Sequence, residues 1–426
     1  MKIRFKVGFN LALKELMLLD HQGLPVTTDS PDAIAAIDQF AQQMLGYENN
    51  PQVILQGLAA DPTSVLVNAH VAALHLFAET ASASTAAKPY LYAAQQHLDL
   101  ATEREQLYVE AIAAWSDYDF DRALACHTVL AECYPQDVLA AQIGQYHHFN
   151  LGNAQGLLKL AETILPANLE NHFVYGMVAF GLEQCHRLTE AETAGRQAVE
   201  MNRQDPWAHH AVAHVMETQH RLDEGIAWME SLADTWENCG TFRTHNWWHV
   251  ALYYLAQSNV EQVLHLYDSQ IWGRAVKDYS QCLINAISLL VRLELRGIDV
   301  GDRWQELGDA VRDRHDHISP LLDTQYIYAL TRAGYDQWVR EMLDSIVAYS
   351  QQAHPSIRAI WAEVTVPVAQ AMMAHARQDW STCVKQLAIA NPKLHQLGGS
   401  HAQRDIYHQI YHHAKTQQSL SSRFNL

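Results

Sequence analysis

The chain has 426 residues, of which 49% are hydrophobic, and its formal net charge is -18 with histidine counted as neutral. The hydrophobic content is sufficient for a large core and excludes a disordered chain. The negative charge argues against nucleic acid and anionic membranes as partners, because both attract positively charged surfaces. The six cysteines include no Cys-x-x-Cys pair, which indicates reduced thiols and predicts a cytoplasmic protein.

The first 19 residues, MKIRFKVGFNLALKELMLL, begin with positive charges and continue with apolar residues. Lys14 and Glu15 interrupt the apolar run, and no cleavage site of small residues follows. The segment therefore predicts an amphipathic helix rather than a signal peptide. We expect further helices up to about residue 100. No apolar run in the chain approaches the length of a membrane span.

Beyond this segment, strand patterns are nearly absent and apolar residues recur every three or four positions. Five segments have the layout of a helix, a short polar turn and a second helix: 104–137, 172–206, 207–236, 244–270 and 366–392. Small residues such as Gly181 and Ala191 let two helices pack closely, and a proline such as Pro206 stops the second helix. These features are typical of loose tetratricopeptide-like repeats.

One hairpin cannot bury its own apolar face, so neighbouring hairpins must stack without a break. The chain contains no Pro/Ser-rich linker that would separate domains. The sequence therefore predicts one all-α domain over 1–426, an α-solenoid of tetratricopeptide-like helical hairpins that curls around a central cavity. A capping helix over 398–426 is expected to close it.

Four stretches are more specific than generic repeat residues: HAVAHVMETQHRLDEGIAWMESLADTW, HNWWHVALYYL, LELRGIDVGDRW and LGGSHAQRDIY. They closely resemble the tetratricopeptide repeat protein 38 family, also called StaR-like, and the resemblance extends over nearly the whole chain. It implies an α-helical repeat fold and no established reaction. Some bacterial members look associated with natural-product biosynthesis.

The candidate site is a group of histidines in the third and fourth hairpins. A helix advances about 100° per residue, so His210, His214 and Glu217 lie along one stripe. His245 and His249 form a second stripe on the first helix of the next hairpin. First helices line the concave side of such a solenoid, so both stripes are expected to face the same cavity. These five residues are the predicted metal ligands, and such a set suits zinc, iron or nickel.

Two alternatives accompany this prediction. The imidazoles could instead be buried polar groups, each bonded to a carboxylate, a carbonyl or water. Aromatic residues such as Trp248 could line the cavity, although repeat cores commonly use aromatic side chains as filler. The expected function is therefore the binding of a peptide or small molecule in a His/Trp-lined concave cavity. The alternative is an enzyme that uses the histidine cluster, with or without a metal.

The stretch LGGSHAQRD (397–405) contains two glycines that permit a sharp turn, then Ser400 and Gln403 in the spacing of a capping box. If the solenoid curls back, the first turn of the following helix would border the histidine cavity. That places His401, Arg404 and Asp405 among the expected ligand-binding residues, with the helix N-terminus available to an anionic group. By contrast, RDRHDHIS (312–319) has mixed charge and is expected to be a solvated helix end.

Overall fold

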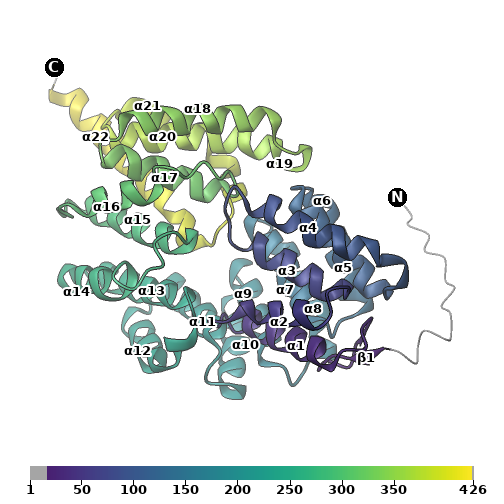
Figure 1. Cartoon of the computed structure of the whole chain (residues 1–426). Helices are drawn as coiled ribbons and strands as arrows, with labels where there is room; N and C mark the ends of the chain where they lie inside the picture. The colour runs from purple at the N-terminus through teal and green to yellow at the C-terminus, as the bar shows by residue number, and fades with distance from the viewer. Residues whose placement is uncertain (1–16, 425–426) are drawn as a thin grey trace.

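The computed structural model describes residues 17–424 (Figure 1). The predicted N-terminal helix lies almost entirely outside these residues. Its last part, Leu18–Leu19, forms strand β1, which pairs antiparallel with β2 (Pro25–Val26). These two short strands form the only sheet in residues 17–424. All other regular structure there is helical, so the prediction of an all-α repeat fold is confirmed.

The helices follow one another as antiparallel pairs joined by short turns. Those of the first half are α1 (Pro31–Leu45), α2 (Ile54–Ala60), α3 (Val65–Leu76), α4 (Ala83–Gln96), α5 (Glu103–Ser116), α6 (Phe120–Cys133), α7 (Val138–Asn150), α8 (Ala154–Ile164), α9 (His172–Gln184), α10 (Leu188–Met201), α11 (Pro206–Thr218) and α12 (Leu222–Leu232). The second half contains α13 (Phe242–Ala256), α14 (Val260–Leu266), α15 (Ser280–Glu294), α16 (Arg303–Val311), α17 (Pro320–Arg332), α18 (Asp336–Gln352), α19 (Pro355–Ile360), α20 (Val366–Ala376), α21 (Trp380–Ala390) and α22 (His401–Phe424).

Each of the five hairpin segments expected from the sequence contains two of these helices, from α5 and α6 in the first to α20 and α21 in the last. The sequence analysis missed further pairs, among them α7 with α8 and α17 with α18. In both pairs the first helix is almost wholly buried, with little polar surface. Its apolar pattern is therefore weakly periodic, which hides the unit from a search for amphipathic helices.

Short acidic and amide side chains define where many of these helices begin. Asp119, Asp137, Asn153 and Asp379 each accept a hydrogen bond from the backbone N–H three residues further on. Each such cap satisfies an N–H group that the helix leaves unpaired and contributes about 1 kcal/mol. The chain therefore restarts as a helix directly after each turn.

Close packing between neighbouring helices depends on small residues at the crossings. A Cβ added at Gly181 on α9 would lie 2.8 Å from the Cα of Leu158 on α8, which is closer than atoms can approach. Any larger residue at this position would push the two helices apart. The glycine that the sequence pattern singled out is therefore required by the crossing itself.

The stack bends until its first third meets its last third (Figure 1). The backbone N–H of Ala81, after α3, donates to Asp316 Oδ1 at 2.9 Å. The Tyr146 hydroxyl on α7 donates to Glu79 Oε1 at 2.5 Å, and Ser280 at the start of α15 binds the other oxygen of Glu79. Helix α22 begins in the middle of the molecule and ends at its edge, near the C-terminus (Figure 1).

No helix in residues 17–424 combines the length and the apolar character that a membrane crossing requires.

The buried histidines outside the candidate site generate a prediction for stability against pH. Burial lowers the pKa of His70 and of His127 to about 3, and Arg104 adds to the effect at His70. The folded pKa lies below the unfolded value of about 6.5, so the unfolded chain binds more protons as the pH falls. Each of the two histidines should reduce the free energy of unfolding by about 1 to 1.5 kcal/mol between pH 7.5 and pH 5.5.

Urea denaturation at the two pH values measures this effect. The substitution His127→Gln should make the loss between them smaller, while His265→Gln should leave it unchanged, because the His265 side chain is exposed on α14. Equal free energies of unfolding at pH 7.5 and pH 5.5 would contradict the assignment of neutral buried imidazoles.

Candidate functional site

Helices α11 and α13 bring the four predicted histidines together. His210 and His214 lie one turn apart on α11, and His245 and His249 lie one turn apart on α13; all four are at most 5% exposed. The Nε2 atom of His210 lies 3.1 Å from Nε2 of His245 and 3.0 Å from Nε2 of His214. The rings of His214 and His249 have centroids 4.4 Å apart. The two stripes therefore face each other in the interior.

In two of these rings, an oxygen atom contacts Nδ1, the nitrogen that faces away from the other imidazoles. Glu217 Oε2 lies 3.1 Å from Nδ1 of His249, and Asn285 Oδ1 on α15 lies 3.0 Å from Nδ1 of His245. Gln281 donates to the same Asn285 oxygen, which fits an amide that turns its oxygen toward His245. A carboxylate or amide oxygen accepts, which favours a proton on each of these two Nδ1 atoms and a lone pair on each Nε2. Two contacts oppose this assignment: burial raises the pKa of Glu217 to about 7, and Gln281 Nε2 lies 3.2 Å from the same His245 Nδ1.

The candidate ligand atoms of His210, His214 and His249 all lie within 4.8 Å of one another. His245 joins this group through its contact with His210. Glu217 was predicted as a direct ligand, but its carboxylate lies behind His249 and binds the outer nitrogen of that ring. Such carboxylate contacts orient metal-ligating histidines in known metal sites.

Burial determines the charge state of the cluster. It lowers the pKa of His245 and His249 to about 3, and it lowers the pKa of His210 and His214 well below the usual value. The neighbouring imidazoles add to the effect at three of the four, while Arg292 does so at His249. The cluster is therefore neutral at pH 7, which is the form of histidine that binds metal ions.

Glu183 on α9 is an acidic neighbour that the sequence analysis missed. It is fully buried, its Oε2 lies 3.9 Å from His214 Nδ1, and its Oε1 has no hydrogen-bond partner in the described residues. Burial raises the pKa of Glu183 to about 8, and Arg404 opposes this rise. A glutamate within the apolar run of α9 is the sequence signal that could have identified it.

The start of α22 is close enough to His214 and Glu183 for its charges to affect their pKa values. Gly398 and Gly399 have φ angles of 77° and 79°, which a residue with a side chain rarely adopts. The backbone N–H of Gln403 donates to Ser400 Oγ, and the N–H of Ser400 donates to Gln403 Oε1, so the predicted capping box is confirmed. His401 Nε2 lies 3.0 Å from the carbonyl oxygen of Gln184, next to Glu183.

Arg404 and Asp405 contribute charge to this region. Arg404 donates to the carbonyl of Gly399. Its positive charge opposes the rise that burial causes in the pKa of Glu183, and it adds to the lowering that burial causes in the pKa of His214. Its guanidinium therefore faces the interior of the molecule while it closes its own turn. The negative charge of Asp405 opposes the lowering that burial causes in the pKa of Arg292, a buried residue of α15 that the sequence analysis did not identify.

Arg292 links α15 to α22 and to the aromatic part of the site. Its Nη2 donates to the carbonyl of Ala402 at 2.6 Å, and its guanidinium carbon lies 5.4 Å from the ring centre of Trp248. Burial lowers the pKa of Arg292 to about 10, and Asp405 and Glu217 oppose this change. Trp248 itself is fully buried and donates from Nε1 to Ser288 Oγ. It therefore contributes to core packing, which is the alternative that the sequence left open.

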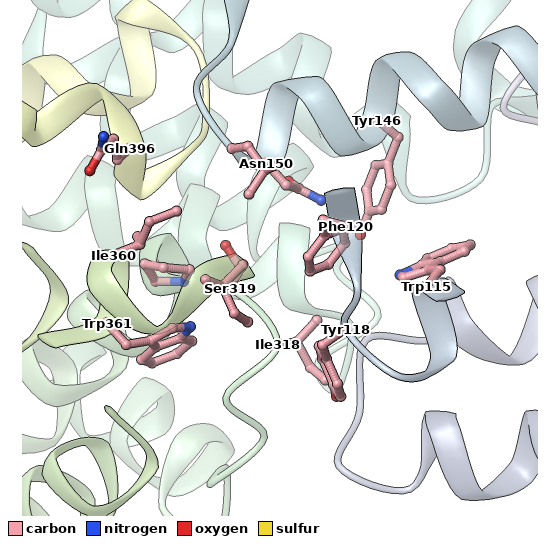
Figure 2. Close-up of a pocket in the computed structure, with 13 residues that line it drawn as sticks. Trp115, Tyr118, Phe120, Tyr146, Asn150, Ile318, Ser319, Ile360, Trp361 and Gln396 are labelled. Atoms are coloured by element: carbon pink, nitrogen blue, oxygen red, sulfur yellow. The ribbon is translucent and has the colours of Figure 1, made fainter. Parts of the chain in front are cut away.

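A separate pocket lies between α5–α7 and α17–α19 (Figure 2). Five of its lining residues are aromatic, and they are Trp115, Tyr118, Phe120, Tyr146 and Trp361. None of the cavity residues predicted from the sequence lines this pocket.

No model of a known protein family matches the chain. Among solved structures, it is similar to the human IFIT1 dimer with m7Gppp-AAAA, with 13% identity, a TM-score of 0.37, and coverage of 96% of this chain and 95% of that one. It is also similar to the P58(IPK) TPR domain, with 11% identity, a TM-score of 0.23, and coverage of 76% and 90%. The chain's own antiparallel helix pairs make it an all-α helical repeat protein. Likeness at this level of identity concerns the fold alone.

The capping box at α22 generates a prediction for stability. The substitution Ser400→Ala removes the acceptor of the Gln403 N–H and should lower the free energy of unfolding by about 1 kcal/mol. Chemical denaturation measures the loss. The control is Ser419→Ala in the same helix, where the hydroxyl donates only to the carbonyl of Lys415 and the residue is exposed. Equal stabilities of the two variants would contradict a stabilising cap.

Proposed function

We propose that this repeat protein binds a divalent transition-metal ion between α11 and α13. His210, His214 and His249 are the proposed ligands, and His245 is the fourth imidazole in reach. The observation that carries the proposal is the set of converging Nε2 atoms. With protons on the Nδ1 atoms beside Glu217 and Asn285, the Nε2 lone pairs of these rings point toward the other imidazoles.

Lone pairs that face each other in a buried place repel, and only a cation or a donated proton relieves the repulsion. His249 Nε2 is buried and has no partner within residues 17–424. His210 Nε2 lies close to two other Nε2 atoms, and one proton cannot serve both contacts well. A single metal ion would satisfy several of these nitrogens together.

Two of the nitrogen–nitrogen separations are close to those of a metal site. Imidazole nitrogens lie about 2.0 to 2.1 Å from zinc, so two nitrogens of a tetrahedral site are about 3.4 Å apart. The observed Nε2 separations of 3.0 and 3.1 Å lie near this value. An all-nitrogen set suits zinc, iron or nickel, and geometry alone does not select among them.

The expected ligand of the protein, a peptide or small molecule, would bind next to this centre. The start of α22 supplies an oriented helix N-terminus, and His401 lies in its first turn. The resemblance to the tetratricopeptide repeat protein 38 family and a cytoplasmic location belong to the same proposal. All six cysteines are unpaired, which suits a reducing compartment.

Elemental analysis of protein purified without a histidine tag tests the metal site. We expect about one equivalent of zinc, iron or nickel, and its removal by a chelator should lower the melting temperature by several degrees, since ligands that bind only the folded state stabilise it. The substitution His214→Gln should abolish retention of the metal. The matched control is His375→Gln, because His375 is a buried histidine that contacts His413 away from the cluster.

Two outcomes would overturn the proposal. One is a protein that carries no metal and gains none when titrated with zinc, iron(II) or nickel. The other is a His214→Gln variant that folds and retains as much metal as the wild type. In either case the cluster would be a hydrogen-bonded network only.

A further inference from the structure

Only the first part of the segment 312–319 is the solvated helix end that was expected, because Arg312 and Asp313 are exposed directly after α16. Helix α16 ends at Val311, and the following loop carries His317 into the interior, where it is 8% exposed. Its ring stacks on Tyr349 and packs edge-on against Trp361. The expectation failed for the later residues because their charges are paired within the molecule; Arg314, for example, binds Asp316.

His317 stands between a carboxylate and a hydroxyl. Its Nδ1 lies 2.5 Å from Asp323 Oδ2 on α17, and its Nε2 lies 2.6 Å from Ser345 Oγ on α18. Asp323 is 1% exposed, while Ser345 is half-buried. The carboxylate accepts the Nδ1 proton, so Nε2 is free to accept the proton of the serine hydroxyl. This is the order of groups that activates a serine nucleophile.

Two features distinguish this contact from ordinary helix packing. Serines and threonines in the helices of this protein commonly donate to a carbonyl of their own helix, as Ser350 does to Val347. Ser345 instead contacts an imidazole 28 positions away in the sequence. His317 also has a φ of 49°, although it lies six residues beyond the end of α16 rather than at a helix end. Backbone of this kind costs energy and persists where the surroundings impose it.

The aromatic pocket lies directly beside this group. Ile318 and Ser319, the two residues after His317, line it, and so does Trp361, which contacts the His317 ring (Figure 2). The backbone N–H groups of Ile318 and Ser319 donate no hydrogen bond within residues 17–424. Unpaired backbone N–H groups beside a general base are the kind of donor that stabilises an oxygen developing negative charge.

We propose that Ser345, His317 and Asp323 form an acyl-transfer site that takes small carboxylic esters at the half-buried Ser345 hydroxyl. Ser345 Oγ attacks the ester carbonyl carbon and transfers its proton to His317 Nε2. The bond to the leaving oxygen then breaks, and the imidazolium returns the proton to that oxygen. Water attacks the acyl-serine by the same route, releases the acid and restores the hydroxyl. The proposal is independent of the metal centre.

Covalent labelling tests this site on the full-length protein. The probe is diisopropyl fluorophosphate, which phosphorylates activated serines, and peptide mass spectrometry locates the adduct. We expect modification of Ser345 and not of Ser350, which lies on the same helix. The variants His317→Gln and Asp323→Asn should slow the labelling at least about 100-fold, since a positioned general base contributes that much or more. Hydrolysis of 4-nitrophenyl acetate should fall in parallel and should survive Ser350→Ala.

The proposal is overturned if Ser345 of the wild type remains unmodified at a probe concentration that labels a known serine hydrolase. It is also overturned if a folded Asp323→Asn or His317→Gln variant is labelled as fast as the wild type. Circular dichroism and the melting temperature establish that each variant is folded. If one variant does not fold, the other still tests the proposal, because Asp323 acts on Ser345 only through the His317 ring.

Discussion

Four neutral imidazoles meet in an interior that shields them from water, and the arrangement around them follows from that constraint. A buried ring nitrogen without a partner costs a few kcal/mol, so each needs a donor, an acceptor or a cation. Glu217 and Asn285 satisfy two outer nitrogens from two different helices. The inner nitrogens are left to one another, and this contact is the basis of the proposed metal site.

The curl of the solenoid places the supporting groups around that centre. Helices α9, α15 and α22 all reach it, although they come from distant parts of the chain. Arg292 illustrates the coupling, because it contacts the start of α22, packs over Trp248 and offsets the charges of Glu217 and Asp405. A buried arginine is tolerated only with such partners. The last helix is therefore held by the same groups that surround the histidines.

The sequence predicted the parts of this arrangement that depend on local rules. Helical spacing placed His210 with His214, and the repeat pattern placed α11 beside α13. The capping box at Ser400 followed from residues three apart. The supporting groups could not be predicted in this way, since Glu183, Asn285 and Arg292 reach the site only through packing between hairpins. The contact of His317 with Ser345 has the same cause, because a loop and a helix 28 positions apart meet only in the folded molecule.

X-ray absorption spectroscopy of the purified, untagged protein tests the central claim most directly. At the absorption edge of the retained metal, the account predicts a first shell dominated by three or four nitrogen atoms at about 2.0 to 2.1 Å for zinc, with the outer-ring scattering that imidazoles produce. A first shell of sulfur, a shell of oxygen atoms without imidazole scattering, or the absence of any retained metal would contradict it.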